Sequence, residues 1–293
     1  MIKYCSQNLK NSFTFLALKF LSKIFKYLPR KLSIQIGYTL GKLIYLIFPK
    51  RKLVAATNLK IAFPNLNQLE LENLLKKTYC NFSIMATEFL RQNMNSYKNV
   101  YIDYETKKIL ESKSGIILMT AHFGNWELIP STLSRIKKIA IVVKIQKNFG
   151  GDKFIQNQRK INGVELISMK DSKTKMLNAI IDGKILGLAS DQNAKHKGTD
   201  SLFFNKQVSV PKGAGYFHFK TNIPIVVGFC IMNDDFSYNF KLKPLLVDKE
   251  IKDFDGICNM VNNEYSRILE EEIKLHPEQY FWFHKKWNKE IYK

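Results

Sequence analysis

The 293-residue sequence lacks the cysteine patterns that mark disulfide frameworks and structural zinc sites. Its four cysteines, Cys5, Cys80, Cys230 and Cys258, are scattered, with no CxxC pair and no histidine at metal-ligand spacing beside them. We therefore expect reduced thiols in a cytosol-facing protein, and no bound metal. A GxSxG motif is also missing, so the sequence offers no serine nucleophile of the hydrolase type.

Acidic residues are scarce relative to basic ones. Asp and Glu total 25 against 46 Lys and Arg, which gives a formal net charge of +21. This excess calls for a polyanionic partner: nucleic acid, an anionic membrane surface, or an acidic protein or phosphorylated substrate. With 45% hydrophobic and 24% charged residues, the composition suits one sizeable globular domain with appendages.

The N-terminal region has no apolar run of the ~20 residues that a membrane-spanning helix needs. In "FTFLALKFLSKIFKYLPRK" the apolar residues recur every three or four positions on one face, and Lys19, Lys23, Lys26 and Arg30 follow the same rhythm on another. That pattern predicts an amphipathic helix with a basic side. The next apolar segment, 32–48, is slightly short to span a bilayer, so lying in the interface, packing on the domain and crossing all stay open. No signal-peptide cleavage site follows, so we expect no removable leader.

Beyond residue 53 the pattern of apolar and polar residues changes twice. A helical stretch runs to about residue 91, with a turn at Pro64-Asn65. Short apolar runs then alternate with amphipathic stretches, which predicts an α/β fold with a central, mostly parallel sheet flanked by helices. The expected strands are 115–121, 139–143, 164–168, 185–190, 225–229 and 238–242, and the expected helices between them are 126–137, 153–161, 174–181 and 212–221.

The stretch "TAHFGNWE" (120–127) follows the first of these strands and holds the strongest chemical signal. Ligands of open α/β sheets gather at the carboxyl ends of strands, where His122 falls. If Gly124 and Asn125 make a turn and a helix begins at Trp126, the Glu127 carboxylate can accept the Nδ1 proton of His122 and leave Nε2 free as a base. Without a nearby serine or cysteine nucleophile, these parts suit direct attack of an alcohol on a thioester. The amides of the Gly124-Asn125 turn would be available to the oxyanion.

The "HFGNWE" element resembles that of the late acyltransferases of lipid A biosynthesis, the lauroyl and myristoyl transferases, which carry HxxxxE. Further similarities run in order to the C-terminus: "NGVELI" (162–167), "ASDQN" (189–193), "VPKGAGYFHFKTNIPIVV" (210–227) and "HPEQYFWFHKKW" (276–287). The resemblance implies a glycerol-phosphate-acyltransferase-like catalytic domain over 53–293, preceded by a membrane-associating helical segment over 1–52.

The family resemblance also implies the reaction. A fatty acyl group would pass from acyl carrier protein to the hydroxyl of a hydroxyacyl chain on a lipid A precursor, in lipopolysaccharide or lipooligosaccharide biosynthesis at the cytoplasmic face of the inner membrane. No cofactor is expected. Anionic inner-membrane lipids are the remaining partner, since an acidic carrier protein, a phosphorylated acceptor and an anionic leaflet all suit a basic chain.

By the same resemblance, His122 would be the general base, Glu127 its orienting partner, and Arg159 a cation for a phosphate or a polarised carbonyl. Asp191, in "ASDQN", matches the family's Asp-Gln element and ends a predicted strand on the same sheet edge. Lys144 stands where relatives usually carry an arginine, which keeps the charge but loses the bidentate fork. Trp126 and the 280–283 aromatic cluster are expected to pack the core, and His284 to make a hydrogen bond there.

Three alternatives stay open on the sequence alone. One is an acyltransferase for another membrane glycolipid or a phospholipid. The second is a non-catalytic, basic membrane-surface module, which leaves "HFGNWE" unexplained. The third is a nucleic-acid-binding protein, against which the chain shows no recognisable RNA- or DNA-binding module; we expect no nucleic-acid partner.

Overall fold

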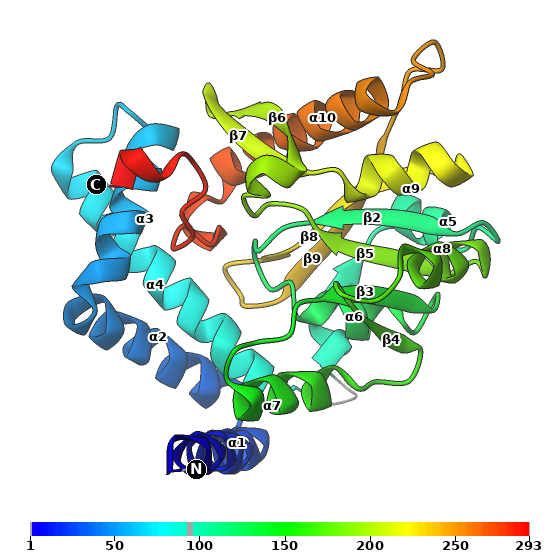
Figure 1. Cartoon of the computed structure of the whole chain (residues 1–293). Coiled ribbons are helices and arrows are strands. Elements are labelled where there is room, and N and C mark those ends of the chain that lie inside the picture. Colours follow the sequence, from blue (N-terminus) through cyan, green and yellow to red (C-terminus); the bar gives the residue numbers. More distant parts are fainter. Residues whose placement is uncertain (1, 93–95, 293) are drawn as a thin grey trace.

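A computed structural model of the chain describes residues 2–92 and 96–292. Its centre is a seven-stranded sheet in the order β1-β9-β8-β2-β5-β3-β4 (Figure 1). The five strands β8 (Ile225–Met232), β2 (Ile116–Thr120), β5 (Ile185–Ala189), β3 (Ile139–Val143) and β4 (Val164–Ser168) run parallel to one another. β9 (Tyr238–Leu245) pairs antiparallel with β8, and β1 (Val100–Ile102) extends that edge. The predicted α/β class with a mostly parallel sheet is confirmed.

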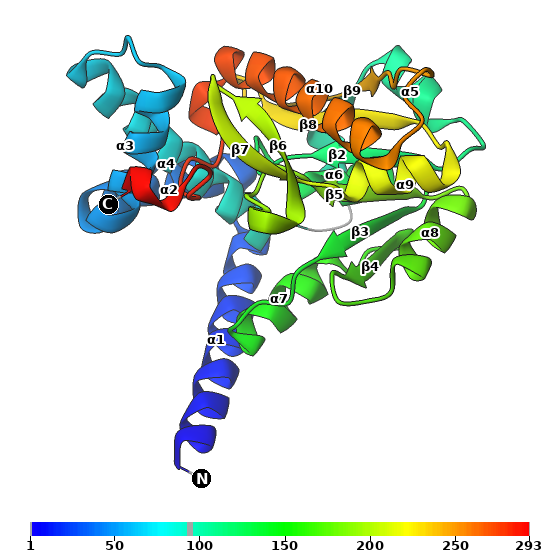
Figure 2. The same cartoon turned by 45° about the horizontal axis from the view of Figure 1, so that its top comes forward.

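Helices cover both faces of this sheet because its strands are apolar on both sides. On β2, Ile116 and Leu118 face a core shared with α5 (Tyr104–Leu110) and α6 (Leu128–Leu133). Ile117 and Met119 face the opposite core, which receives α8 (Lys173–Ile181), α9 (Gly213–Thr221) and α10 (Phe254–Leu275). A two-stranded hairpin, β6 (Gly198–Phe203) with β7 (Lys206–Pro211), packs beside α10 (Figure 2).

Four helices precede the sheet. They are α1 (Ile2–Tyr27), α2 (Arg30–Ile47), α3 (Pro49–Ala62) and α4 (Gln68–Leu90). α4 begins at a capping box in which the Asn67 side chain and Glu70 satisfy each other's main-chain amides. α2 packs along α4, where the rings of Tyr45 and Tyr79 meet edge to face at 5.7 Å. α1 projects away from the sheet and packs along α7 (Phe149–Arg159) (Figure 2).

The amphipathic helix expected near the N-terminus is present as α1, with Phe13, Leu16 and Phe20 exposed along it. Within the described residues, no single helix is both long and apolar enough to cross a membrane. Taken together, α2 and residues 51–62 are long and apolar enough, but they meet at an angle of 97°. The expected boundary between residues 52 and 53 lies inside α3, and the division into two functional segments stays a prediction.

All six predicted strands are found, although β8 and β9 each extend three residues further. The four predicted helices are found as α6 to α9, with α6 shorter than expected. β1, the β6–β7 hairpin and the helices α5 and α10 were not predicted. Cys80, Cys230 and Cys258 are free and buried, while the side chain of Cys5 lies outside the described residues.

Candidate active site

The site forms where β2 and β5 end side by side. Thr120, the last residue of β2, is in register with Ala189, the last residue of β5. His122 and Asp191 each follow two residues later, so the parallel pairing brings them to the same edge of the sheet. There His122 Nδ1 lies 2.9 Å from Asp191 Oδ1. The expectation that both residues share this edge is confirmed, and the contact makes Asp191 the carboxylate that orients the ring.

The predicted pairing of His122 with Glu127 is wrong. Glu127 is the N-cap residue of the short helix α6, and its carboxylate is directed toward the end of α7. There Arg159 holds it with two hydrogen bonds, 2.9 Å from Nε to Oε2 and 2.6 Å from Nη2 to Oε1. The Trp126 indole adds a third at 3.1 Å. Both carboxylate oxygens are therefore occupied by neighbours other than His122, a geometry that the five-residue spacing did not reveal.

The turn at Gly124 and Asn125 is structural as well. Gly124 adopts φ +60°, and a Cβ there would lie 2.0 Å from the Cys230 carbonyl oxygen, so only glycine fits. Its main-chain amide donates to the Gln279 carbonyl at 3.0 Å, and the main-chain amide of Asn125 donates to the Cys230 carbonyl at 2.7 Å. Because these carbonyls occupy both amides, the expectation that they stabilise an oxyanion is wrong.

The C-terminal segment 279–286 lies against the same turn. The Phe281 amide donates to the His122 carbonyl at 2.9 Å, and Phe123 forms a bridge with Tyr280. The predicted packing of the 280–283 cluster is confirmed, since Tyr280, Trp282 and Phe283 are buried and Phe281 packs against the core while partly buried. His284 accepts a hydrogen bond from the Asn193 amide at its Nε2, as expected. Sequence reasoning missed that this segment also fixes the main chain of the site.

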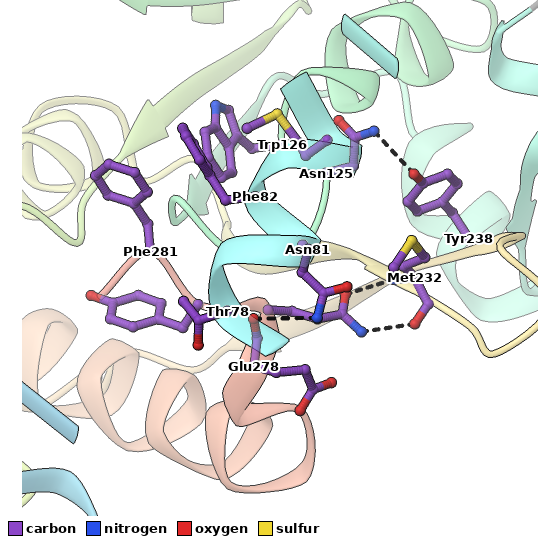
Figure 3. A pocket seen from close by; sticks show the side chains of 13 residues that line it. Thr78, Asn81, Phe82, Asn125, Trp126, Met232, Tyr238, Glu278 and Phe281 are labelled. Atoms are coloured by element: carbon purple, nitrogen blue, oxygen red, sulfur yellow. Dashed lines mark hydrogen bonds between the residues drawn. The ribbon is translucent and has the colours of Figure 1, made fainter. Parts of the chain in front are cut away.

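Aromatic rings enclose His122. Trp126 meets its imidazole edge to face at 5.1 Å, and the Phe281 ring lies 6.0 Å away. Behind them a crevice runs between α4 and the C-terminal segment, lined by Phe82, Trp126 and Phe281 and reaching Asn125 (Figure 3). There the side-chain amide of Asn125 donates to the Tyr238 hydroxyl at 3.3 Å. Trp126 thus packs as predicted, but it packs on the histidine itself.

Lys144 and Arg159 differ in how they are placed. Lys144 follows β3 on the same sheet edge and is exposed to solvent. Arg159 ends α7, and its engagement with Glu127 leaves only part of its guanidinium for a ligand. Their predicted roles in binding a substrate, like the catalytic role of His122, stay predictions.

Opposing effects set the charge of the dyad. Burial lowers the pKa of His122, but the charge and hydrogen bond of Asp191, with the charge of Glu127, outweigh burial and raise it. For Asp191, burial raises the pKa, and the His122 and Lys286 charges outweigh that effect, so the carboxyl stays ionised. Arg159 behaves like His122: burial opposes its charge, and Glu127 raises its pKa. Asp191 therefore favours the imidazolium that forms when His122 accepts a proton.

Metal ligation finds no support in the part of the chain that the structure describes. No group of three His, Cys, Asp or Glu side chains there is placed to hold a metal ion.

The His122 ring has a carboxylate on one nitrogen, and its Nε2 makes no hydrogen bond to another described residue. The arrangement can take a proton from a bound hydroxyl and return it.

Residues 5–289 match the model of a family described as bacterial lipid A biosynthesis acyltransferases. The chain is 19% identical over 271 residues to the lipid A biosynthesis palmitoleoyltransferase of Escherichia coli (strain K12), covering 88% of this chain and 86% of that protein. It has the same identity and coverage with the lipid A biosynthesis acyltransferase of Shigella flexneri. Among solved structures, the 1-acyl-sn-glycerophosphate acyltransferase PlsC of Thermotoga maritima matches at 13% identity and a TM-score of 0.39, covering 84% of this chain and 98% of that one.

Asp191→Asn tests what holds the proton on His122. The substitution removes the charge and the acceptor that raise the pKa of His122, while burial remains, so the pKa should fall below the ordinary value of about 6.5. NMR titration of ¹³C-labelled histidine measures it. Asp171→Asn, at an exposed ion pair with Lys175, is the matched control and should leave it unmoved. An unchanged value in Asp191→Asn would show that the 2.9 Å contact does not govern His122.

Arg159→Met tests the bracing of Glu127. It leaves a buried carboxylate with only the Trp126 indole, so the free energy of unfolding should fall by about 3 kcal/mol. Replacing both partners, Glu127→Met with Arg159→Met, removes the unpaired charge and should recover part of that loss. Guanidinium unfolding measures both variants, with Lys160→Met at the exposed end of α7 as the control. A double variant no more stable than Arg159→Met would argue against the pairing.

Proposed function

The chain belongs to the bacterial lipid A biosynthesis acyltransferase family, and from this premise we propose that it transfers a fatty acyl group from acyl carrier protein to the hydroxyl of a hydroxyacyl chain on a lipid A precursor. One observation carries the proposed mechanism. His122 is oriented through Nδ1 by Asp191 at the carboxyl edge of the sheet, and its Nε2 is left without a partner among the described residues. An imidazole held in this way is equipped to deprotonate an alcohol.

The proposed reaction proceeds by direct attack. His122 Nε2 takes the proton of the acceptor hydroxyl as its oxygen attacks the thioester carbonyl carbon. Collapse of the tetrahedral intermediate breaks the C–S bond, and the imidazolium returns the proton to the departing thiolate. The new ester keeps the acyl carbon and the acceptor oxygen, and the carrier leaves as a thiol. Asp191 remains a carboxylate throughout and stabilises the imidazolium.

Glu127 and Arg159 have a supporting part in this proposal. Arg159 binds both oxygens of Glu127, so the motif's acid anchors the turn that carries His122 to α7. The Glu127 charge still reaches His122 and helps to raise its pKa. The acid of the motif thus acts on the base at a distance, while Asp191 contacts it.

Three acidic or anionic partners fit the charge of +21. Acyl carrier protein, a phosphorylated acceptor and an anionic leaflet would all be attracted by one basic molecule. We place the enzyme at the cytoplasmic face of the inner membrane. The support is α1, whose exposed Phe13, Leu16 and Phe20 suit the headgroup boundary beside its lysines.

Acyl transfer from a labelled acyl-carrier-protein thioester to a tetraacylated lipid A precursor tests the function. Removing the base in His122→Ala should lower the rate by about 10²- to 10⁴-fold in protein that remains folded. His196→Ala, at an exposed histidine, is the control and should keep the wild-type rate.

The activity of the wild type tests the proposed acceptor, and the activity of His122→Ala tests the proposed mechanism. A wild type that is inactive with this acceptor but active with another glycolipid or a phospholipid would contradict the proposed substrate. An active wild type matched by His122→Ala would place the chemistry elsewhere.

A further inference from the structure

Lys286 is a buried cation that the mechanism above does not use. Its residue is 4% exposed, and its ammonium lies 4.4 Å from the centre of the Phe203 ring. Its Nζ donates a hydrogen bond to the main-chain carbonyl of Asp191. Within the described residues, no carboxylate oxygen lies within 4.0 Å of Nζ, so this lysine has no direct ion pair. Lysine is almost never fully buried unless it is paired, which makes its position informative.

A second hydrogen bond ties Lys286 to the same loop. The Asn193 side-chain amide donates to the Lys286 main-chain carbonyl at 2.8 Å. In return, the Lys286 ammonium donates to the main-chain carbonyl of Asp191, two residues before Asn193. The Asn193 main-chain amide also donates to His284 Nε2 at 3.3 Å. These contacts hold the lysine beside the loop that carries Asp191 and limit the ways in which its charge could move away.

The charge of Lys286 acts on the Asp191 carboxylate although Nζ contacts only the main-chain carbonyl of that residue. It contributes, after the larger effect of His122, to keeping the pKa of Asp191 low against burial. Burial lowers the pKa of Lys286 itself to about 8, while the charges of Asp191 and of Glu270 on α10 raise it. Two tyrosines also lie near this carboxylate. Burial, with the charge of Asp191, raises the pKa of the Tyr280 and Tyr265 hydroxyls, and Tyr265 on α10 donates to the Thr120 carbonyl at 2.8 Å.

Three further charged groups act on the histidines of the site. Glu127 raises the pKa of His122, and Arg159 on α7 lowers it. For His284, burial has the largest effect and lowers the pKa; the Lys286 and Arg51 charges act in the same direction. Lys286 is a buried cation that contacts the main chain of Asp191 and favours the ionised form of the carboxylate that orients the base.

Resting on the proposed acyl transfer, we propose that Lys286 is a positioning residue whose ammonium opposes the charge of Asp191, so that Asp191 orients His122 while holding a proton on it less firmly. A general base must be unprotonated when the substrate arrives. A buried carboxylate hydrogen-bonded to an imidazole favours the imidazolium, which cannot accept a proton. A buried cation that acts on that carboxylate opposes this tendency and leaves the hydrogen bond in place. The balance keeps the ring oriented and limits how far Asp191 raises the pKa of His122.

Lys286→Met and Lys286→Gln test the role of the charge, since glutamine retains a donor and methionine does not. Removing the positive charge that opposes Asp191 should raise the pKa of the His122 imidazole, and we expect a rise of about one unit in both variants. At neutral pH, kcat/KM should then fall by up to about tenfold and return as the pH is raised. A solely structural role would move neither the pKa nor the pH dependence.

Lys286→Arg and Lys285→Met are the matched controls. The first keeps the buried charge, and the second removes the neighbouring exposed one. Both should keep the wild-type pKa of His122, measured by NMR of ¹³C-labelled histidine. If both neutral variants fail to fold, the wild type carries the test: the His122 resonance should show a second inflection near pH 8, where Lys286 loses its charge, and Lys286→Arg should abolish it.

A pKa of His122 that is unchanged or lowered in the neutral variants would overturn the proposal, as would a rate loss equal at every pH. The NMR titration needs no substrate, so the two proposals fail separately. If the wild type is inactive but the His122 pKa rises in the neutral Lys286 variants, the proposed acyl transfer is overturned and the role of Lys286 stands. If the wild type is active but the His122 pKa stays the same in these variants, only the role of Lys286 is overturned.

Discussion

The 2.9 Å contact between His122 Nδ1 and Asp191 Oδ1 is the interaction on which the site depends. It exists because β2 and β5 are adjacent, parallel and in register, so that loops separated by 69 residues of sequence leave the sheet at one point. Every other feature of the site supports or modifies this contact. Trp126 and Phe281 enclose the ring. The C-terminal segment binds the main chain at both residues, through the Phe281 amide at His122 and the Lys286 ammonium at Asp191.

The second acid of the site has a different task. Glu127 is bound by Arg159 at the end of α7, and α7 is in turn the helix on which α1 rests. The approach is close, since a Cβ at Gly150 of α7 would lie 1.8 Å from the Asn11 carbonyl oxygen of α1. The Asn148 side chain also donates to Thr14 at 3.2 Å. One helix thus connects the turn that carries His122 to the amphipathic helix proposed to meet the membrane.

The sequence was sufficient for the architecture because strand and helix periodicities are local signals. The runs at 139–143 and 164–168 matched β3 and β4 at both ends. His122 and Asp191 could be placed on one edge because both follow predicted strands. The partner of Glu127 could not be found in this way, since Arg159 lies 32 residues away and the pairing depends on how α7 packs. Lys286 was missed for a related reason. One lysine among many in a basic chain carries no mark of burial until the fold is known.

The most direct test of this arrangement is the tautomer of neutral His122. ¹⁵N NMR of the labelled imidazole, recorded above its pKa, distinguishes a proton on Nδ1 from one on Nε2. Our account predicts a proton on Nδ1, shared with Asp191, in the wild type and equally in Glu127→Gln, with that preference lost in Asp191→Asn. A proton on Nε2 in the wild type, or a tautomer that changes with Glu127 and not with Asp191, would contradict it.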